Sequence, residues 1–454
     1  MQTPYVPHLF GDAVQAKLKA QRGWLTVGVA SSVAWPQEDV WVEYDSHEYV
    51  LRGAKGGEEK RPPCISTPCP QAAIDAALTR VYRFASILGW FKGGHVDPTG
   101  SIWGTGPMLY GSRDTFTTTL EGGKHFDCNY LPVVDDDQVR KALAFMREGR
   151  RLRHVHEPYS FLSFFKVVES QFTSKDRVAW IQANLDQLDA DAAKRVADLR
   201  AQGVDVSKHL YESGRSAVAH AGLGGVIVDP DIPADRRRIA EDLDVMAGLA
   251  TRYLQVDACV PDDMELYRTR DRTSPWHKFL PDETLQRLQV GEEIKDAAEL
   301  GQLERSKVSV RLWPNEAPEE MRQMDIFAEG AAPGVVHFLV HNRRRTIFLR
   351  FALDIANGRL HTLLEDGGMS EQFNGIAEPE LEHYTRYFHS VIGNAKVELC
   401  IDGTDPVLCE VVIPVNIIPQ VPEKMVSLAM EQFRRQKVEA GASKGAADDG
   451  NQLA

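Results

Sequence analysis

An arginine and a histidine five positions apart are the residues of this sequence best suited to chemistry. Arg215 is followed by four residues and then by His220. A guanidinium is always charged and can meet two phosphate oxygens at once. An imidazole titrates near neutral pH, so it can take or give a proton. Such a pair could act on a phosphodiester, with His220 as the acid–base group and Arg215 stabilising the charge that builds on the phosphate.

The helix expected to carry this pair limits how its side chains can meet. Positions five apart lie about 140° apart around a helix, at about 100° per residue, so only the length of the Arg215 side chain can partly close the gap. Gly222 follows soon after His220 and is expected to stop the helix. A helix C-terminus favours positive charge, which suits a histidine acting as a general acid.

Two further residues are predicted to support the site. Ser216 directly follows the arginine, and Glu169 lies on a segment that is otherwise strongly apolar. A buried carboxylate needs a partner, so Glu169 is expected to contact Arg215. The same contact is expected if the arginine only stabilises a helical bundle and His220 is a packed residue at a helix end. The contact therefore does not separate the catalytic from the structural interpretation.

The segment Leu210–Gly222, LYESGRSAVAHAG, lies late in a predicted helical bundle and resembles the HEPN superfamily. The resemblance implies a metal-independent endoribonuclease, with a role in stress or phage defence, and a homodimer whose two Arg–His pairs face one cleft. Non-catalytic HEPN domains instead bind nucleotides or partners. The sequence departs from the family at Ser216, where Asn, Asp or His is common. One toxin subgroup has a tyrosine at the position of Gly222, so that subgroup is not assigned.

A second resemblance covers the middle of the chain. The run His156–Glu169, HEPYSFLSFFKVVE, and the later run Val228–Asp235, VDPDIPAD, look like the methylamine utilization protein MauJ family, which the flanking regions resemble only loosely. That resemblance implies no cofactor. It permits a non-catalytic accessory or scaffold protein as the alternative to a ribonuclease.

A dense basic stretch precedes the apolar run. The chain as a whole carries a formal net charge of −13, so an RNA backbone, which needs clustered Lys and Arg, could be held only locally. The residues proposed to contact RNA beside the cleft are Arg147, Arg150, Arg151, Arg153 and His154. The alternative, which we favour slightly, is a solvated helix face paired with Asp and Glu.

The composition favours a soluble cytoplasmic protein. Six cysteines are spread thinly over 454 residues, which suits a reducing compartment. Neither a signal peptide nor an apolar run of membrane-spanning length is recognisable, so no membrane association is predicted. Cys64, Cys69, His125 and Cys128 have ligand types that suit zinc, but their spacing is loose. Ordinary buried thiols are favoured, and neither a metal nor a cofactor is predicted.

The pattern of elements predicts an α+β protein. Residues 1–132 form a β-rich N-terminal domain with one long helix at 71–91, and residues 135–257 form an all-α HEPN-like bundle whose short loops imply antiparallel helices. Residues 258–438 form a β-rich C-terminal domain with a terminal helix from 422. Residues 439–454 are rich in Ala, Gly, Asp and Ser, and are predicted to be disordered.

The individual strands are predicted from short runs of β-branched and aromatic residues bounded by turn formers. Asp45-Ser46 and Asn357-Gly358 are predicted turns, and Lys55–Pro70 is predicted to be a loop. The best strands are 24–30, 40–44, 47–52, 308–313, 335–341, 346–353, 396–401 and 407–415.

Overall fold

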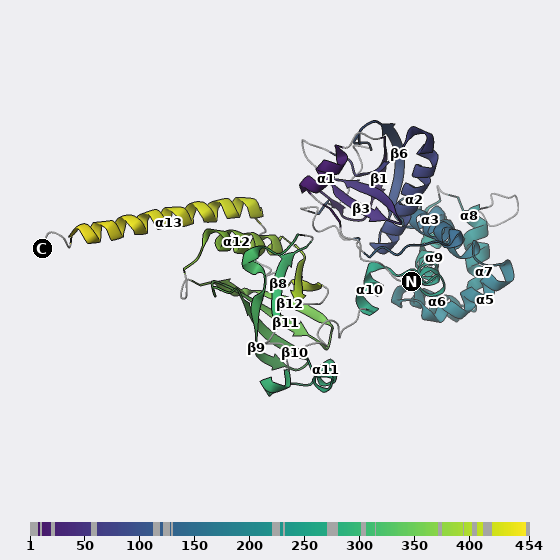
Figure 1. Ribbon diagram of the computed structural model, residues 1–454. Helices are drawn as coiled ribbons and strands as arrows, with labels where there is room; N and C mark the ends of the chain where they lie inside the picture. The colour runs from purple at the N-terminus through teal and green to yellow at the C-terminus, as the bar shows by residue number, and fades with distance from the viewer. Residues whose placement is uncertain are drawn as a thin grey trace. The chain divides into compact units, whose positions relative to one another are not determined.

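The chain divides into two compact units, Met1–Thr269 and Arg270–Ala454. β-rich regions flank a central helical region (Figure 1), which confirms the α+β class. The computed structural model describes residues 8–9, 11–19, 23–55, 61–111, 119–120, 128, 130–219, 228–229, 232–269, 280–300, 306–313, 315–370, 375–393, 395–401, 406–411 and 420–450. No helix in these ranges is both long and apolar enough to cross a membrane.

The first unit begins with an antiparallel sheet of five strands in the order β3-β4-β5-β1-β6. The strands are β1 (Trp24–Ser31), β3 (Val40–Tyr44), β4 (His47–Arg52), β5 (Cys64–Pro68) and β6 (Val96–Gly104). Asp45 and Ser46 have positive φ angles of 48° and 59°, as a tight two-residue hairpin turn requires. The predicted turn between β3 and β4 is therefore confirmed.

Strand β5 corrects the prediction of a continuous loop at 55–70. It pairs with both β4 and β1, so it lies inside the sheet. The Thr26 and Ser66 hydroxyls are 2.8 Å apart and both buried. The strand is only five residues long and is flanked by Gly and Pro. The segment is a strand because it is buried between two neighbouring strands, and the local sequence pattern does not predict such pairing.

Helix α2 (Ile74–Phe91) packs against this sheet, and the helical region follows. Tyr49 of β4 stacks on Phe84 of α2 with ring centroids 4.2 Å apart. The remaining elements of the unit are α1 (Gly11–Leu18), β2 (Trp35–Pro36), β7 (Thr119–Leu120), α3 (Asp137–Leu152), α4 (Glu157–Glu169), α5 (Ser174–Asn184), α6 (Ala190–Ala201), α7 (Val206–His209), α8 (Ala217–Ala219), α9 (Pro233–Arg252) and α10 (Asp263–Thr269).

Helix α4 is the centre of the bundle. It packs on α3 and α9, and Phe161, Phe164 and Phe165 are almost completely buried. Burial of each such ring contributes roughly 1.5–3 kcal/mol. The same hydrophobic core continues through α2 to the sheet. The residues predicted to form an N-terminal domain and a separate bundle thus share one core within one compact unit.

The second unit is built on a closed barrel in the order β10-β11-β12-β14-β13-β8-β9. Every pair is antiparallel except β12–β14, which is parallel. The strands are β8 (Lys307–Leu312), β9 (Met324–Ala332), β10 (Val335–His341), β11 (Ile347–Asp354), β12 (Arg359–Met369), β13 (Val397–Ile401) and β14 (Val407–Val411). Phe338 and Phe351, stacked at 5.6 Å, are part of its core.

Three helices accompany the barrel: α11 (Asp282–Gln289), α12 (Glu378–Ile392) and α13 (Pro422–Gly450). Helices α12 and α13 pack on each other. Helix α13 extends to Gly450, beyond the point at 439 from which disorder was predicted. Alanine is frequent in this stretch and has the highest helix propensity, which gives a physical reason for the difference.

A buried carboxylate connects α12 to the barrel. Glu380 is 2% exposed. Its Oε1 accepts hydrogen bonds from the Thr346 hydroxyl at 2.7 Å and the Asn342 amide at 3.1 Å, and its Oε2 accepts one from the Ala377 backbone N–H at 2.7 Å. We expect Glu380→Ala to destabilise the second unit by roughly 2–4 kcal/mol, because buried donors are left unsatisfied. Hydrogen exchange of the β10 and β11 amides measures this change.

Glu382 on the same helix provides the matched control. Its side chain is 41% exposed and pairs with Arg386 at 3.1 Å, and pairs of this kind near the surface contribute at most about 1 kcal/mol. Equal changes in exchange for Glu380→Ala and Glu382→Ala would contradict the role given to the buried network.

Candidate functional site: an arginine pair at the end of α4

Arg215 lies on a π-helical turn, Leu210–Ser216, between α7 and α8. Such turns are uncommon and often occur at functional sites. Gly214 permits close packing of this turn on α4, because a Cβ there would lie 2.4 Å from the Phe161 ring. The helix expected to carry Arg215 and His220 is helical from Val206 to Ala219, where the described residues stop, and its middle is a wider π-helical turn. The wider turn changes the direction of side chains relative to a regular α-helix.

The predicted contact between Glu169 and Arg215 is present. Glu169 is the last residue of α4, and its Oε1 lies 3.1 Å from the Arg215 Nε. The same oxygen accepts a hydrogen bond from the Arg177 Nη1 at 3.1 Å. The Arg177 side chain is 7% exposed and that of Arg215 is 22% exposed. One carboxylate thus faces two guanidinium groups.

An aromatic ring completes this cluster. The Arg177 and Arg215 guanidinium carbons lie 5.2 and 5.9 Å from the centroid of the Tyr211 ring, within the range of cation–π attraction. Tyr211 also contacts Phe165, with centroids 6.3 Å apart, yet it is 38% exposed. We call Glu169, Arg177, Tyr211 and Arg215 the Arg215 cluster.

Sequence reasoning missed Arg177 and Tyr211. Tyr211 is four positions before Arg215, a spacing that places two residues on one helix face, so this signal was present. Arg177 had no comparable signal, because it lies on α5 and reaches Glu169 only through the packing of α5 on α4.

His220 lies outside the described residues, so its predicted role and its separation from Arg215 stay predictions. Ser216 ends the π-helical turn and is half-buried. The Arg215 cluster places two guanidinium groups against a partly exposed aromatic ring. The proton transfer assigned to His220 depends on a residue that the described ranges do not include.

Three of the basic residues proposed to contact RNA form contacts within the fold. Arg147 contacts Asp97, with Nε and Oδ1 3.3 Å apart, and donates to the Ser86 hydroxyl at 2.9 Å. Arg153 pairs with Asp244 of α9. These contacts join α3 to its neighbours.

Arg150 is the third. Its Nη1 donates to the backbone carbonyls of Gly89 at 3.0 Å and Gly94 at 3.1 Å, around the C-terminus of α2, where cations are favoured. Burial lowers the Arg150 pKa to about 10, which leaves it protonated at neutral pH. Arg151 is half-buried and His154 is exposed. Of the five residues, these two are therefore the better candidates for contact with a ligand from solvent.

A second charged cluster in the same unit was not predicted. Asp242 of α9 is 1% exposed. Its Oδ1 accepts a hydrogen bond from the Arg195 Nε at 2.8 Å, and its Oδ2 lies 2.6 Å from the His209 Nε2. Burial by itself raises the pKa of the Asp242 carboxyl, but hydrogen bonds and charge from His209 and Arg195 hold it below its usual value. This cluster joins α6, α7 and α9.

The residues considered for zinc do not gather around a common point in the described ranges. The Cys128 Sγ lies 3.1 Å from the His8 Nε2, and burial raises the pKa of the Cys64 thiol to about 11. His125 lies outside the described residues. Among those that are described, no group of three or more His, Cys, Asp or Glu residues is placed to hold a metal ion.

The first unit therefore contains a helical bundle with a charged cluster where the π-helical turn Leu210–Ser216 meets the end of α4. A family model described as "Methylamine utilization protein MauJ" matches residues 142–255, a range that includes α4, the π-helical turn and α9. The resemblance inferred from the runs at 156–169 and 228–235 is thus supported over the bundle. No curated protein and no solved structure matches the chain.

Proposed function

We propose that the helical region is a metal-independent endoribonuclease of HEPN type, active in stress or phage defence. The observation that carries the proposal is the Arg215 cluster, in which two guanidinium groups share the single Glu169 carboxylate beside a partly exposed Tyr211. Guanidinium groups beside a partly exposed aromatic ring suit stacked bases and phosphates.

The proposed roles follow from the chemistry of RNA cleavage. The ribose 2′-oxygen forms a bond to phosphorus as the bond to the 5′-oxygen breaks. His220 gives its proton to the leaving 5′-oxygen, and the proton of the 2′-hydroxyl passes to solvent. Arg215 stabilises the charge on the phosphate oxygens, with Glu169 and Ser216 as supporting residues. The products are a 2′,3′-cyclic phosphate and a 5′-hydroxyl.

The RNA strand is proposed to run along the basic stretch of α3. Arg151 and His154 are the best supported contacts, because Arg147, Arg150 and Arg153 already bond within the fold. Phosphate contacts of this kind weaken as salt rises. Cleavage should therefore fall with ionic strength more steeply in the wild type than in Arg151→Gln.

A homodimer through the helical region is part of the proposal, since the resemblance to HEPN proteins implies that two Arg–His pairs share one cleft. We expect light scattering after size-exclusion chromatography to give twice the mass of 50.7 kDa calculated for one chain. A monomer that still cleaves RNA would contradict the shared cleft while leaving the activity intact.

The decisive experiment is incubation of the purified protein with a mixed RNA pool in EDTA. Cleavage that leaves 2′,3′-cyclic phosphate ends, and that is lost in both Arg215→Ala and His220→Ala, would support the proposal. Equal cleavage by all three proteins would assign the activity to a contaminant or another site.

The second candidate is a non-catalytic accessory or scaffold protein with a HEPN-like binding module. Two observations favour it: the family model that matches is named for methylamine utilization, and most of the basic stretch bonds within the fold. This candidate predicts no cleavage by the wild type. It also predicts that Arg215→Ala changes stability alone, by loss of the Glu169 ion pair.

A further inference from the structure

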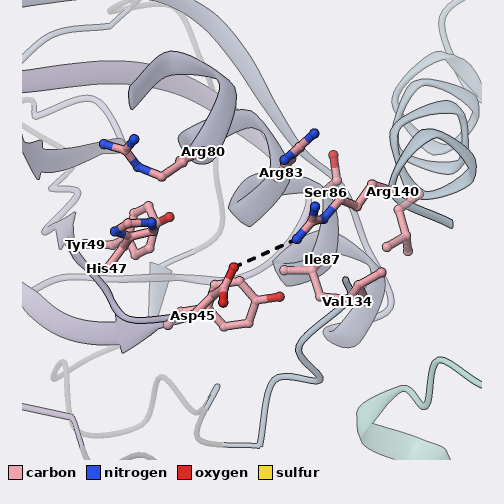
Figure 2. Close-up of a pocket in the computed structure, with 11 residues that line it drawn as sticks. Asp45, His47, Tyr49, Arg80, Arg83, Ser86, Ile87, Val134 and Arg140 are labelled. Carbon is pink, nitrogen blue, oxygen red and sulfur yellow. Dashed lines mark ion pairs between the residues drawn. The ribbon is translucent and has the colours of Figure 1, made fainter. Parts of the chain in front are cut away.

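A separate pocket of about 200 Å³ lies in the first unit, between the β3–β4 hairpin and helices α2 and α3 (Figure 2). It contains no residue of the Arg215 cluster. The residues that line it are Tyr44, Asp45, His47, Tyr49, Arg80, Arg83, Ser86, Ile87, Val134, Arg140 and Leu143.

The pocket is rich in arginine although the chain is acidic. Three arginines line it together with one aspartate, and Asp137 outside the lining pairs with two of the arginines, so much of their charge is balanced. Arg80 and Arg83 come from α2, three positions apart, and Arg140 comes from α3 (Figure 2). Like charges at this spacing on a helix repel each other.

Two of these arginines are held in place by carboxylates at the edge of the pocket. Asp137 lies 3.0 Å from the Arg83 Nη2 and 3.2 Å from the Arg140 Nη1, and Asp45 lies 4.0 Å from the Arg140 Nη2. Figure 2 draws the Asp45–Arg140 pair as a dashed line across the pocket. These pairs reduce the charge of Arg83 and Arg140 but also fix where their guanidinium groups lie.

Arg80 differs from the other two. Its Nε is buried and has no hydrogen-bond partner among the described residues. Buried N–H donors are satisfied in the great majority of cases, and one left without a partner costs about 1–3 kcal/mol. A donor of this kind beside an open pocket points to an acceptor that enters from solvent.

The aromatic wall of the pocket is rigid before any ligand enters. Tyr49 stacks on Phe84 at 4.2 Å, and the Tyr44 hydroxyl donates to the Pro132 carbonyl at 3.0 Å. Burial raises the pKa of both phenols well above the usual value, so both stay neutral and add no negative charge. Affinity is greater when a site does not have to be ordered on binding.

We propose that this pocket binds a small phosphate monoester. Guanidinium groups match the oxygens of a phosphate with paired, charge-assisted hydrogen bonds. The volume is below the roughly 300–1,000 Å³ of pockets for drug-sized ligands. Ile87, Val134 and Leu143 provide an apolar wall for an organic group of about the size of one ring.

The test is calorimetric titration of the full chain at low salt with phenyl phosphate, inorganic phosphate and phenol. The pH is kept above the second phosphate pKa of about 6. We expect phenyl phosphate to bind, inorganic phosphate to bind at least about tenfold more weakly because it lacks the ring, and phenol not to bind at millimolar concentration. Absence of phenyl phosphate binding, or equal affinity for inorganic phosphate, would overturn the assignment to a monoester.

Two charge-neutralising variants locate the site. Arg80→Gln should weaken phenyl phosphate binding by about tenfold or more, since hydrogen bonds to charged groups contribute about 1.5–3 kcal/mol. Lys141→Gln removes the same charge from an exposed position beside Arg140 that does not line the pocket, and should change the affinity by less than about twofold.

A folding control keeps the result interpretable. Circular dichroism checks each variant, and Arg83→Gln replaces Arg80→Gln if the latter does not fold. Equal binding by wild type, the arginine variant and Lys141→Gln would overturn the proposal. RNA cleavage by the same proteins is measured in parallel, so loss of phosphate binding and loss of cleavage are distinguished.

Discussion

Arg215→Ala should lower the rate of RNA cleavage by about a hundredfold or more, because loss of one group that stabilises transition-state charge costs about 10²–10³ in rate. Arg215→Lys keeps the charge but loses the planar guanidinium group. Its cleavage rate should lie between those of the wild type and the alanine variant. The measurement is the single-turnover rate on a defined RNA in EDTA. His220→Ala should lose a comparable factor, since general acid–base groups contribute about 10²–10⁴.

The control for this series is Arg200→Ala. Arg200 is on α6, is exposed and pairs with Asp186 at 2.5 Å. Its replacement by alanine removes one surface charge from the same bundle without affecting the Arg215 cluster. Its cleavage rate should stay within about twofold of the wild type. If Arg200→Ala and Arg215→Ala lose comparable amounts of cleavage rate, the effect comes from the total charge of the bundle. Arg215 would then have no specific role.

Asp242→Ala should destabilise the first unit by about 3–5 kcal/mol, the usual cost of removing one partner from a buried ion pair. Arg195 and His209 would lose a carboxylate that is 1% exposed and within 2.8 Å of both. The measurement is urea unfolding followed by hydrogen exchange of α9 amides. Asp244→Ala on the same helix is the control, because Asp244 is about half exposed and should cost less than about 1 kcal/mol.

The same carboxylate predicts a dependence of stability on pH. The pKa of Asp242 is lower in the folded chain than its unfolded value of about 3.9. The unfolded chain therefore binds more protons, and the stabilisation is fully present above the unfolded pKa and is lost as pH falls through the folded one. The wild type should lose stability on acidification below about pH 4 more steeply than Asp242→Asn. Parallel acid-unfolding curves for the two proteins would contradict this assignment.

Local sequence signals predicted much of the secondary structure. The Asp45-Ser46 and Asn357-Gly358 turns are confirmed, because the chain conformation at such positions is decided by the residues themselves. Strand β12 after Asn357-Gly358 was not among the predicted strands. It ends in the polar and glycine-rich run EDGGM, so its identity comes from pairing in the barrel and not from local propensity.

The sequence by itself determined the α+β class, the apolar face of α4 and the contact expected between Glu169 and Arg215. A periodic pattern reports which face of a helix is buried. The tertiary structure alone decided which side chains meet: Arg177 with Glu169, His209 with Asp242, and three arginines around one pocket. These neighbours are far apart along the chain or come from different elements. Packing brings them together, and packing depends on the complementary shape of whole surfaces and not on any local run of residues.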